Sequence, residues 1–224
     1  MILESNLKGL CQKFGIDFQQ FLTDFNIEHT NELSINDLEA ICDEYEVDLQ
    51  ALLFTPLYTP DVHRKALNKI KFLLLDVDGV MTDGGMYVSE NGDQLKKYNT
   101  KDGMGILHLK EKGIQVGIIS SGFTEKMVQQ RAELLGIKHC YIGRKPKLEI
   151  LETWLKELNL SFDQIAMIGD DINDLEIMKK VGLAVCPKDA VVKIKSNSHI
   201  ILSKKGGEGC IREFIDVYLM AEPI

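Results

Sequence analysis

Two clusters of acidic residues each follow an apolar run of the kind that forms a strand buried on both faces. The first cluster lies in the segment 71–80 and the second in the segment 165–174. Their acidic members are Asp76 and Asp78 in the first cluster and Asp170, Asp171 and Asp174 in the second. Ligands of open parallel sheets bind just beyond the carboxyl ends of the strands, so both clusters are expected to face one crevice. Carboxylates crowded together in this way repel one another unless a cation neutralises them.

Magnesium is the cation that fits such a cluster, because it takes few protein oxygen ligands and keeps positions for water and substrate phosphate. A carboxylate can also attack phosphorus to form an aspartyl-phosphate, which divides one difficult hydrolysis into two easier steps. Helix caps and turn formers could explain one acidic cluster, but two clusters that each end an apolar strand disfavour this alternative.

From residue 66 onward the chain alternates short apolar runs with helical patterns, which predicts an α/β fold with a doubly wound parallel sheet. The expected strands are residues 71–75, 115–119, 139–142, 165–168, 183–185 and 200–202. The expected helices are residues 103–112, 125–135, 148–158, 174–181 and 210–220. Such a sheet would bring both acidic clusters to the same edge.

Residues 86–97 interrupt this alternation and are expected to form a protruding β-hairpin around Asn91-Gly92. Asn-Gly between strand-like flanks is a strong hairpin signal. The insertion is too short to be a stable lid by itself, and an isolated two-stranded ribbon is only marginally stable. Association between subunits is the simplest source of support for this hairpin.

The first 56 residues form a small all-α unit in which one sequence pattern occurs twice. The segment 7–22 recurs as 38–53 with matching apolar spacing, and Asp17 and Asp48 stand where each could cap a second helix. We therefore expect two helical hairpins packed together over residues 1–56, a linker over 57–65 and the sheet domain over 66–224.

The charge distribution sets this N-terminal unit apart from the rest of the chain. Residues 1–64 carry twelve Asp and Glu residues against three Lys and Arg residues, and the whole chain has a net charge of −8. A helix-turn-helix DNA reader is therefore disfavoured, because contacts to phosphate need cationic residues, and no nucleic-acid partner is expected. Docking to a protein of unknown identity is the preferred role for this unit.

The composition, 45% hydrophobic and 27% charged over 224 residues, is that of a soluble globular protein. No stretch approaches the roughly 20 apolar residues of a membrane helix, and the N-terminus lacks the pattern of a secretory signal, so no membrane partner is expected. Five scattered cysteines without a close pair argue against a zinc or redox site. They fit a reducing compartment, and we expect a cytoplasmic protein.

Four motifs in order resemble those of the haloacid dehalogenase phosphatases over residues 66–220. They are Asp76-x-Asp78-Gly79-Val80, a strand ending in Ser120, Lys147 before a helix, and Gly169-Asp170-Asp171-x-Asn173-Asp174. The resemblance implies that Asp76 is the nucleophile and that Asp78 protonates the leaving alkoxide and later deprotonates the attacking water. It implies that Mg2+ is held by the carboxylates of Asp76 and Asp170 and by the main-chain carbonyl of Asp78. It also implies that Asp171 and Asp174 orient these ligands without binding the metal themselves.

The same resemblance implies a set of groups that bind the phosphoryl oxygens of the substrate. Ser120 and Ser121 would contribute a hydroxyl and neighbouring backbone amides, and Lys147 would contribute a positive charge. Lys145 and Arg144 are rivals of Lys147, which is preferred because it begins a helix, as the family pattern requires.

Three further segments narrow the resemblance to the lidless 3-deoxy-D-manno-octulosonate 8-phosphate phosphatase family. They are Val80-Met81-Thr82-Asp83-Gly84, Thr100-Lys101-Asp102-Gly103-Met104-Gly105 and Lys205-Gly206-Gly207-Glu208-Gly209. The family acts on a sugar-acid phosphate in lipopolysaccharide biosynthesis, its hairpins assemble a homotetramer, and a glycine-rich tail reaches a neighbour's active site. The resemblance implies that the residues closing the site are Lys101, Asp102, Gly206, Gly207 and Glu208. A flexible turn before the helix 210–220 is the alternative for the glycine segment.

The sequence departs from the family pattern at two positions that bear on the substrate. Octulosonate phosphatases usually have Thr-Gly-Arg after the second strand and a nonulosonate-specific relative has Thr-Gly-Glu, whereas this chain has Ser120-Ser121-Gly122-Phe123. Glu208 also stands where a basic residue is common in octulosonate enzymes. An N-acylneuraminate or other nonulosonate 9-phosphate is therefore the alternative to the eight-carbon substrate.

Two other functions fit the sequence less well than this hydrolase. A phosphomutase would have to keep water away from the aspartyl-phosphate, and the sequence contains no segment large enough for such a lid. A binding or assembly protein that uses the phosphatase fold as a scaffold would not need its acidic residues. The intact set of Asp76, Asp78, Lys147 and Asp170 favours an enzyme over this alternative.

Overall fold

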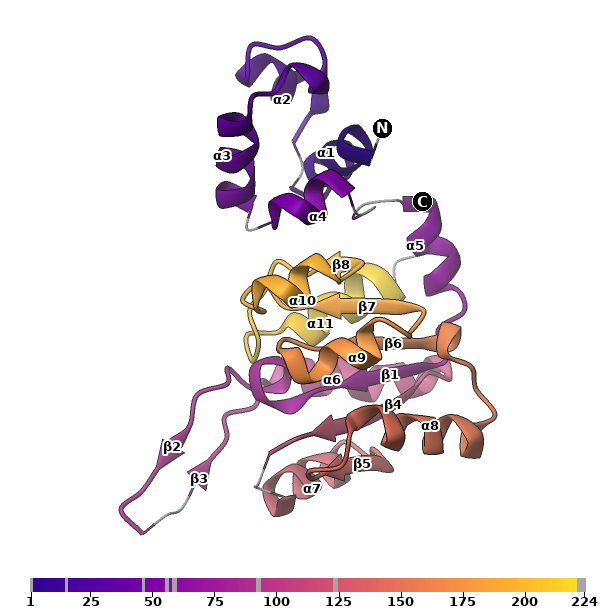
Figure 1. Ribbon diagram of the computed structural model, residues 1–224. Coiled ribbons are helices and arrows are strands. Elements are labelled where there is room, and N and C mark those ends of the chain that lie inside the picture. Colours follow the sequence, from indigo (N-terminus) through magenta and orange to yellow (C-terminus); the bar gives the residue numbers. More distant parts are fainter. Residues whose placement is uncertain are drawn as a thin grey trace.

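The computed structural model describes residues 2–14, 16–45, 47–54, 57, 60–91, 94–122 and 125–220. A helical N-terminal region is followed by an α/β body from which a thin β-hairpin projects (Figure 1). No helix among these residues has both the length and the apolar character needed to cross a bilayer.

The N-terminal region contains the two helical hairpins that its repeat predicts. They are formed by α1 (Ile2–Phe14) with α2 (Phe18–Asp24) and by α3 (Ile35–Tyr45) with α4 (Leu49–Phe54). The Asp17 carboxylate accepts a hydrogen bond from the backbone N–H of Gln20 at 2.9 Å, and the Asp48 carboxylate accepts one from that of Ala51 at 2.9 Å. Both aspartates therefore cap a helix as the sequence predicts. The two hairpins share an apolar cluster of their own, separate from those of the body.

The body is built on a six-stranded parallel sheet with the strand order β5-β4-β1-β6-β7-β8. Its strands are β1 (Phe72–Leu75), β4 (Gln115–Ser120), β5 (His139–Ile142), β6 (Ile165–Ile168), β7 (Leu183–Cys186) and β8 (Ile200–Ile201). β1 and β6 are fully buried along their length, because helices cover both faces of the sheet. The predicted doubly wound α/β fold is confirmed.

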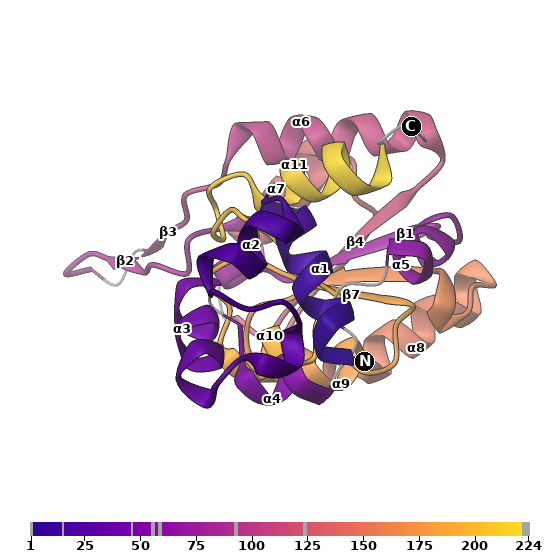
Figure 2. The ribbon, with the colours of Figure 1, turned by 90° about the horizontal axis from the view of Figure 1, so that it is seen from above.

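Each face of the sheet has its own layer of helices (Figure 2). One face packs against α6 (Thr100–Leu109), α7 (Glu125–Leu134) and α11 (Cys210–Phe214). The other face packs against α8 (Lys147–Leu158), α9 (Leu175–Met178) and α10 (Val192–Ser196). The two resulting apolar clusters hold the sheet rigidly, so the loops at its carboxyl edge are anchored to a rigid support.

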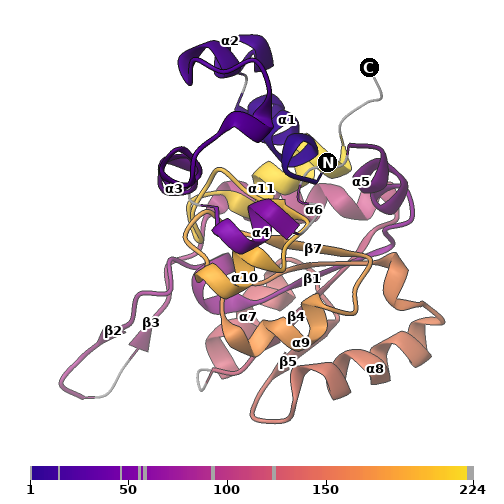
Figure 3. The same cartoon turned by 45° about the horizontal axis from the view of Figure 1, so that its top comes forward.

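The projecting hairpin consists of β2 (Tyr87–Val88) paired antiparallel with β3 (Gln94–Leu95), and we call it the arm. It leaves the body at the carboxyl edge of the sheet and extends away from the helices (Figures 1 and 3). The apolar side chains of the arm are exposed. They are Met86, Tyr87, Val88 and Leu95. Asn91 of the Asn-Gly signal is described, whereas Gly92 and the following Asp93 lie outside the described residues.

Two predicted segments differ from the structure. The expected linker 57–65 contains much of helix α5 (Pro60–Leu67), which packs near β7, and the proline that signals a break begins this helix. The helix expected over 174–181 is reduced to the four residues of α9, preceded by a tight turn at Ile172–Asp174. The Asp171 carboxylate accepts a hydrogen bond from the N–H of Ile172 at 2.7 Å and stabilises this turn.

Candidate active site

The carboxyl ends of three neighbouring strands bring the chemically active residues together. Leu75 at the end of β1 pairs with Ile168 in β6 on one side and with Ile118 in β4 on the other. Asp76 therefore emerges between the segment that carries Asp170 and the segment that ends in Ser120. The crevice predicted from the two acidic clusters is the place where these segments meet.

Lys147, from the first turn of α8, lies between two buried carboxylates. Its ammonium donates to Asp76 Oδ1 at 2.8 Å and to Asp174 Oδ1 at 2.6 Å, and its side chain is only 4% exposed. Burial opposes the charged form of Lys147, but the two carboxylates outweigh this effect and raise its pKa. Lys147 is therefore held as a cation next to the candidate nucleophile. Its rivals Arg144 and Lys145 precede α8.

Asp174 holds other residues of the site in place through hydrogen bonds. Besides the contact with Lys147, its second carboxylate oxygen accepts the backbone N–H groups of Asp170 at 3.1 Å and Asp171 at 3.4 Å. Both oxygens are thus engaged by the protein, and Asp174 fixes the loop that carries Asp170. This geometry agrees with the supporting role that the resemblance implies for it.

Asp170 faces Asp76 across the site. Carboxylate oxygens of Asp76, Asp170 and Asp174 lie within 4.8 Å of one another, and Asp170 Oδ1 is buried without a hydrogen-bond partner among the described residues. Gly79 lies so close that a Cβ atom there would overlap the Asp170 carboxylate, and its φ is +88°. Only glycine can follow Asp78 in this arrangement.

The site contains more negative than positive charge. The buried carboxylates of Asp76 and Asp174 share one lysine, with the partly buried Asp170 beside them, and burial, followed by the neighbouring carboxylates, raises the pKa of Asp76 to about 7 and that of Asp170 to about 8. A buried oxygen without a donor and an excess of negative charge are the features expected of a site for a hard cation. The all-oxygen donor set suits Mg2+ rather than a soft metal. Asp76 and Asp170 are the available ligands, since both oxygens of Asp174 are already engaged.

Asp78 lies closer to the surface and is held from the arm. Lys96, just after β3, forms an ion pair with Asp78 Oδ1, and the Thr82 hydroxyl lies 3.4 Å from the same oxygen. The sequence reasoning missed Lys96, because a lysine beside a hairpin is typical of a solvated flank. Thr82 belongs to the segment 80–84 that supports the family resemblance, but no spacing rule links it to Asp78.

Ser120 and Ser121 lie at the end of β4, beside Asp78. The hydroxyl of Ser120 is buried and accepts the N–H of Gly122 at 3.1 Å, whereas the hydroxyl of Ser121 lies 3.5 Å from the amide of Asn173 at the rim. A Cβ atom at Gly122 would lie 3.2 Å from Ser120 Oγ and 3.4 Å from Asp78 Oδ2. Position 122 therefore borders Asp78, the expected acid–base residue, directly. Phe123 lies outside the described residues.

The glycine segment 205–209 packs against its own chain beside the site. The N–H of Gly207 donates to Val80 O at 2.9 Å, and a Cβ atom at Gly206 would overlap the carbonyl of Gly79. The segment thus supports the loop that follows Asp78. Glu208 and Lys101 are exposed, and Lys101 lies on the first turn of α6.

Asp102 departs from the role that the resemblance implies for it. It is buried, and its carboxylate accepts the backbone N–H of Arg212 at 2.7 Å, so it ties α6 to the start of α11 rather than closing over a substrate. Burial raises the pKa of Asp102 to about 6, although backbone N–H groups of α11 oppose this shift. Its position on the buried face of α6 explains the difference, since the sequence motif alone does not indicate which way a helix residue points.

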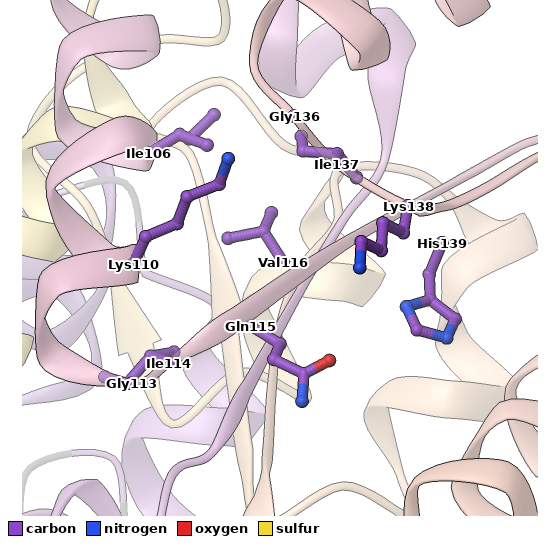
Figure 4. Close-up of a pocket in the computed structure, with 10 residues that line it drawn as sticks. All are labelled: Ile106, Lys110, Gly113, Ile114, Gln115, Val116, Gly136, Ile137, Lys138 and His139. Atoms are coloured by element: carbon purple, nitrogen blue, oxygen red, sulfur yellow. The ribbon is translucent and has the colours of Figure 1, made fainter.

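A cavity of about 460 Å³ lies away from these residues, at the amino ends of β4 and β5 (Figure 4). Its walls include Ile106, Ile114 and Val116, and Lys110 and Lys138 lie at its edge. Because the carboxylates gather at the opposite, carboxyl edge of the sheet, beyond β1 and β6, this cavity is not part of the candidate active site.

Comparison with known sequences identifies related proteins. A family model described as a haloacid dehalogenase-like hydrolase matches residues 104–182. The 3-deoxy-D-manno-octulosonate 8-phosphate phosphatase of Yersinia pestis is 41% identical over 162 residues, which cover 72% of this chain and 86% of that protein. The phosphatase of the same name from Escherichia coli strain K12 is 40% identical over 162 residues, covering 72% and 85%.

Solved structures of such phosphatases share the fold. The crystal structure of the Yersinia pestis phosphatase has a TM-score of 0.70 at 37% identity, covering 73% of this chain and 88% of that one. The structure of the Moraxella catarrhalis phosphatase, described as a complex with magnesium, phosphate and a KDO molecule, has a TM-score of 0.69 at 31% identity. The match covers 74% of this chain and 94% of that chain.

Proposed function

The chain belongs to the 3-deoxy-D-manno-octulosonate 8-phosphate phosphatase family of haloacid dehalogenase-like hydrolases, and from this membership we propose that it hydrolyses 3-deoxy-D-manno-octulosonate 8-phosphate. As a member of this family it is a phosphoric monoester hydrolase, and the alternative of a passive scaffold is not retained. The observation that carries the proposal is the convergence of Asp76, Lys147 and Asp170 at the carboxyl edge of the sheet.

The first chemical step breaks the phosphate ester. The Asp76 carboxylate attacks phosphorus to form an aspartyl-phosphate, and the bond to the sugar oxygen breaks as Asp78 gives its proton to the departing alkoxide. The ammonium of Lys147, 2.8 Å from Asp76 Oδ1, neutralises charge next to the attacking oxygen. Ser120 and Ser121 are proposed to bind the phosphoryl oxygens, supported by their position at the end of β4 beside Asp78.

The second step releases inorganic phosphate. Asp78 now takes a proton from water, and the resulting hydroxide attacks the aspartyl-phosphate, which frees phosphate and restores the Asp76 carboxylate. One residue can serve as acid and then as base because the first step leaves it deprotonated.

Mg2+ is the proposed cofactor, held by the carboxylates of Asp76 and Asp170 and by the main-chain carbonyl of Asp78. When bound, it would neutralise the carboxylates and stabilise negative charge on the phosphoryl oxygens. Two features of this chain support the assignment: the buried Asp170 oxygen, to which no described residue donates, and the unbalanced charge around Lys147.

A nine-carbon nonulosonate 9-phosphate is the second candidate substrate. It is favoured by Gly122, where the family's arginine is missing at a position that borders Asp78, and by the acidic Glu208. A nine-carbon acidic sugar is longer and would need space and hydrogen-bond donors at the position where an octulosonate enzyme has its arginine side chain.

The assembly and the location of the enzyme are also proposals. A homotetramer formed through the arm is supported by the exposure of Tyr87 and Leu95, which are paired across it. A reducing cytoplasm is supported by the free cysteines. The N-terminal helical region, whose domain boundaries we place at residues 1–56, is proposed to dock a protein partner.

Release of inorganic phosphate from a panel of eight- and nine-carbon sugar-acid phosphates tests the proposal. The expected result is turnover of one class with Mg2+ present and none after EDTA treatment, restored when Mg2+ is added back. Preference for the nine-carbon acids would select the second candidate. No release from any sugar-acid phosphate would contradict the proposed substrate class.

A further inference from the structure

The arm contacts the active-site loop through two consecutive lysines that follow β3. Lys96 pairs with Asp78, and Lys97 pairs with Asp83 at 3.2 Å. The two lysines therefore contact opposite ends of the loop 78–83 that follows the nucleophile. We propose that Lys96 is a positioning residue for the acid–base carboxylate of Asp78, so that the arm contributes to catalysis as well as to assembly. This inference rests on the proposed phosphatase reaction.

The two lysines differ in their surroundings. The side chain of Lys96 is 10% exposed, whereas that of Lys97 is 63% exposed. An exposed pair such as Lys97–Asp83 is screened by water and contributes little. A nearly buried ammonium has lost most of its water and depends on its protein partner, so the Lys96 contact restricts Asp78 much more strongly.

The contacts of Asp78 define which of its oxygens is free to react. Lys96 and the Thr82 hydroxyl both engage Oδ1. Oδ2 faces the other way and lies 3.4 Å from the position that a Cβ atom at Gly122 would occupy. Lys96 thus holds the carboxylate with Oδ2 directed toward the loop after β4, where Ser120 and Ser121 are proposed to bind the phosphoryl group. A general acid works only when its oxygen is within hydrogen-bond reach of the leaving group.

Thr82 alone would hold Asp78 poorly. Its hydroxyl lies 3.4 Å from Asp78 Oδ1 and 3.3 Å from the carbonyl of Val77, so it is shared between two acceptors at long distances. Without Lys96 the Asp78 side chain, which is 40% exposed, would be free to rotate toward solvent. The arm therefore supplies the main restraint on this carboxylate among the described residues.

The test compares Lys96→Met, Lys96→Arg and the matched control Lys97→Met, each checked for thermal unfolding and solution mass. The reaction is measured on a sugar-acid phosphate, whose alkoxide needs a proton to leave, and on p-nitrophenyl phosphate, whose phenolate does not. We expect Lys96→Met to lower kcat on the sugar-acid phosphate at least about tenfold with KM nearly unchanged, and to lower it less on p-nitrophenyl phosphate. Lys96→Arg should recover most of the activity, and Lys97→Met should retain it.

Three results would overturn the inference. They are a folded Lys96→Met enzyme with wild-type kcat, an equal loss on both substrates, and an equal loss in Lys97→Met, which would make the lysines anchors of the arm alone. If Lys96→Met does not fold, Lys96→Gln, which keeps one donor for Oδ1, takes its place in the same comparison. A wild-type enzyme that hydrolyses p-nitrophenyl phosphate but no sugar-acid phosphate would contradict the proposed substrate only. Glycerol phosphate then replaces the sugar-acid phosphate as the alkyl ester. The loss of kcat on glycerol phosphate, compared with the loss on p-nitrophenyl phosphate, then decides the role of Lys96.

Discussion

Gly79 and Asp170, 91 positions apart in the sequence, lie so close that a methyl group on Gly79 would overlap the Asp170 carboxylate. The contact joins the two acidic clusters at the ends of β1 and β6. It allows the loop after Asp78 to pass directly over the proposed metal ligand. Any side chain at position 79 must therefore displace Asp170 or the loop.

Gly79→Ala is expected to weaken Mg2+ binding by more than about tenfold, because it displaces the Asp170 carboxylate. The measurement is the Mg2+ concentration that gives half-maximal phosphate release. Gly113→Ala is the matched control, since Gly113 also has a positive φ, of +72°, but apart from its chain neighbours no described residue has an atom within 4 Å of its added Cβ. Gly113→Ala should lower the free energy of unfolding and leave the Mg2+ dependence of phosphate release unchanged. Equal Mg2+ dependence in both variants would contradict the predicted contact.

Lys147→Met is expected to reduce kcat by about 10²-fold or more, because it removes the cation next to the attacking carboxylate. In EDTA it should also lower the free energy of unfolding by about 3–5 kcal/mol, since Asp76 and Asp174 are left buried without their partner. Phosphate release and urea unfolding are the measurements. Lys145→Met is the control and should behave as wild type. A large loss in Lys145→Met with activity retained in Lys147→Met would select the rival lysine.

The stability of the metal-free protein is expected to fall as the pH rises from about 4 to about 8. Burial raises the pKa of Asp76 to about 7 and that of Asp170 to about 8, above the ordinary value of 3.8 that applies in the unfolded chain. A raised pKa contributes stability that is fully present below the unfolded value, and this stability is lost progressively until the pH has passed the folded pKa.

Bound Mg2+ should remove this loss, because it stabilises the ionised carboxylates. The difference in Tm between Mg2+-bound and EDTA-treated protein should therefore increase from about pH 5 to about pH 8.5. Asp170→Asn, which cannot ionise, should reduce both the metal effect and its pH dependence. A Tm difference that is constant across this range would argue against a metal site at these carboxylates.

The solution mass is expected to be about four times that of one chain if the arm assembles a tetramer. Tyr87→Asp combined with Leu95→Asp should lower the mass, because it places two charges on paired, exposed positions of the arm. Light scattering gives the mass. Ile35→Asp, at an exposed apolar position of α3, is the control and should leave the mass unchanged. A wild-type monomer with full activity would refute the tetramer.

The sheet and the position of the two acidic clusters could be predicted from the sequence because both depend on local patterns. The strand 165–168 agrees with β6 at both ends, and an apolar run followed by acidic residues fixes where the functional edge lies. The N-terminal repeat was equally informative, since Asp17 and Asp48 cap helices in both copies. Capping and periodicity act over a few residues and are therefore visible in one sequence.

The contacts that orient the site could not be predicted, because they join distant parts of the chain. Lys96 reaches Asp78 only because the arm returns to the body beside the loop after β1. The direction of Asp102, toward α11 and away from the site, depends on how α6 packs. The proline that begins α5 predicts a linker when it is considered alone, because proline often marks a break in the chain. Tertiary packing decides each of these cases.

The most direct test of the account is to trap the covalent intermediate. The enzyme is mixed with a sugar-acid phosphate labelled in its phosphate group, quenched with acid within the first turnover, and the labelled peptide is identified. The account predicts label on the peptide that contains Asp76, dependent on Mg2+ and absent in Asp76→Asn. Rapid turnover without label on this peptide, or turnover retained in Asp76→Asn, would contradict it.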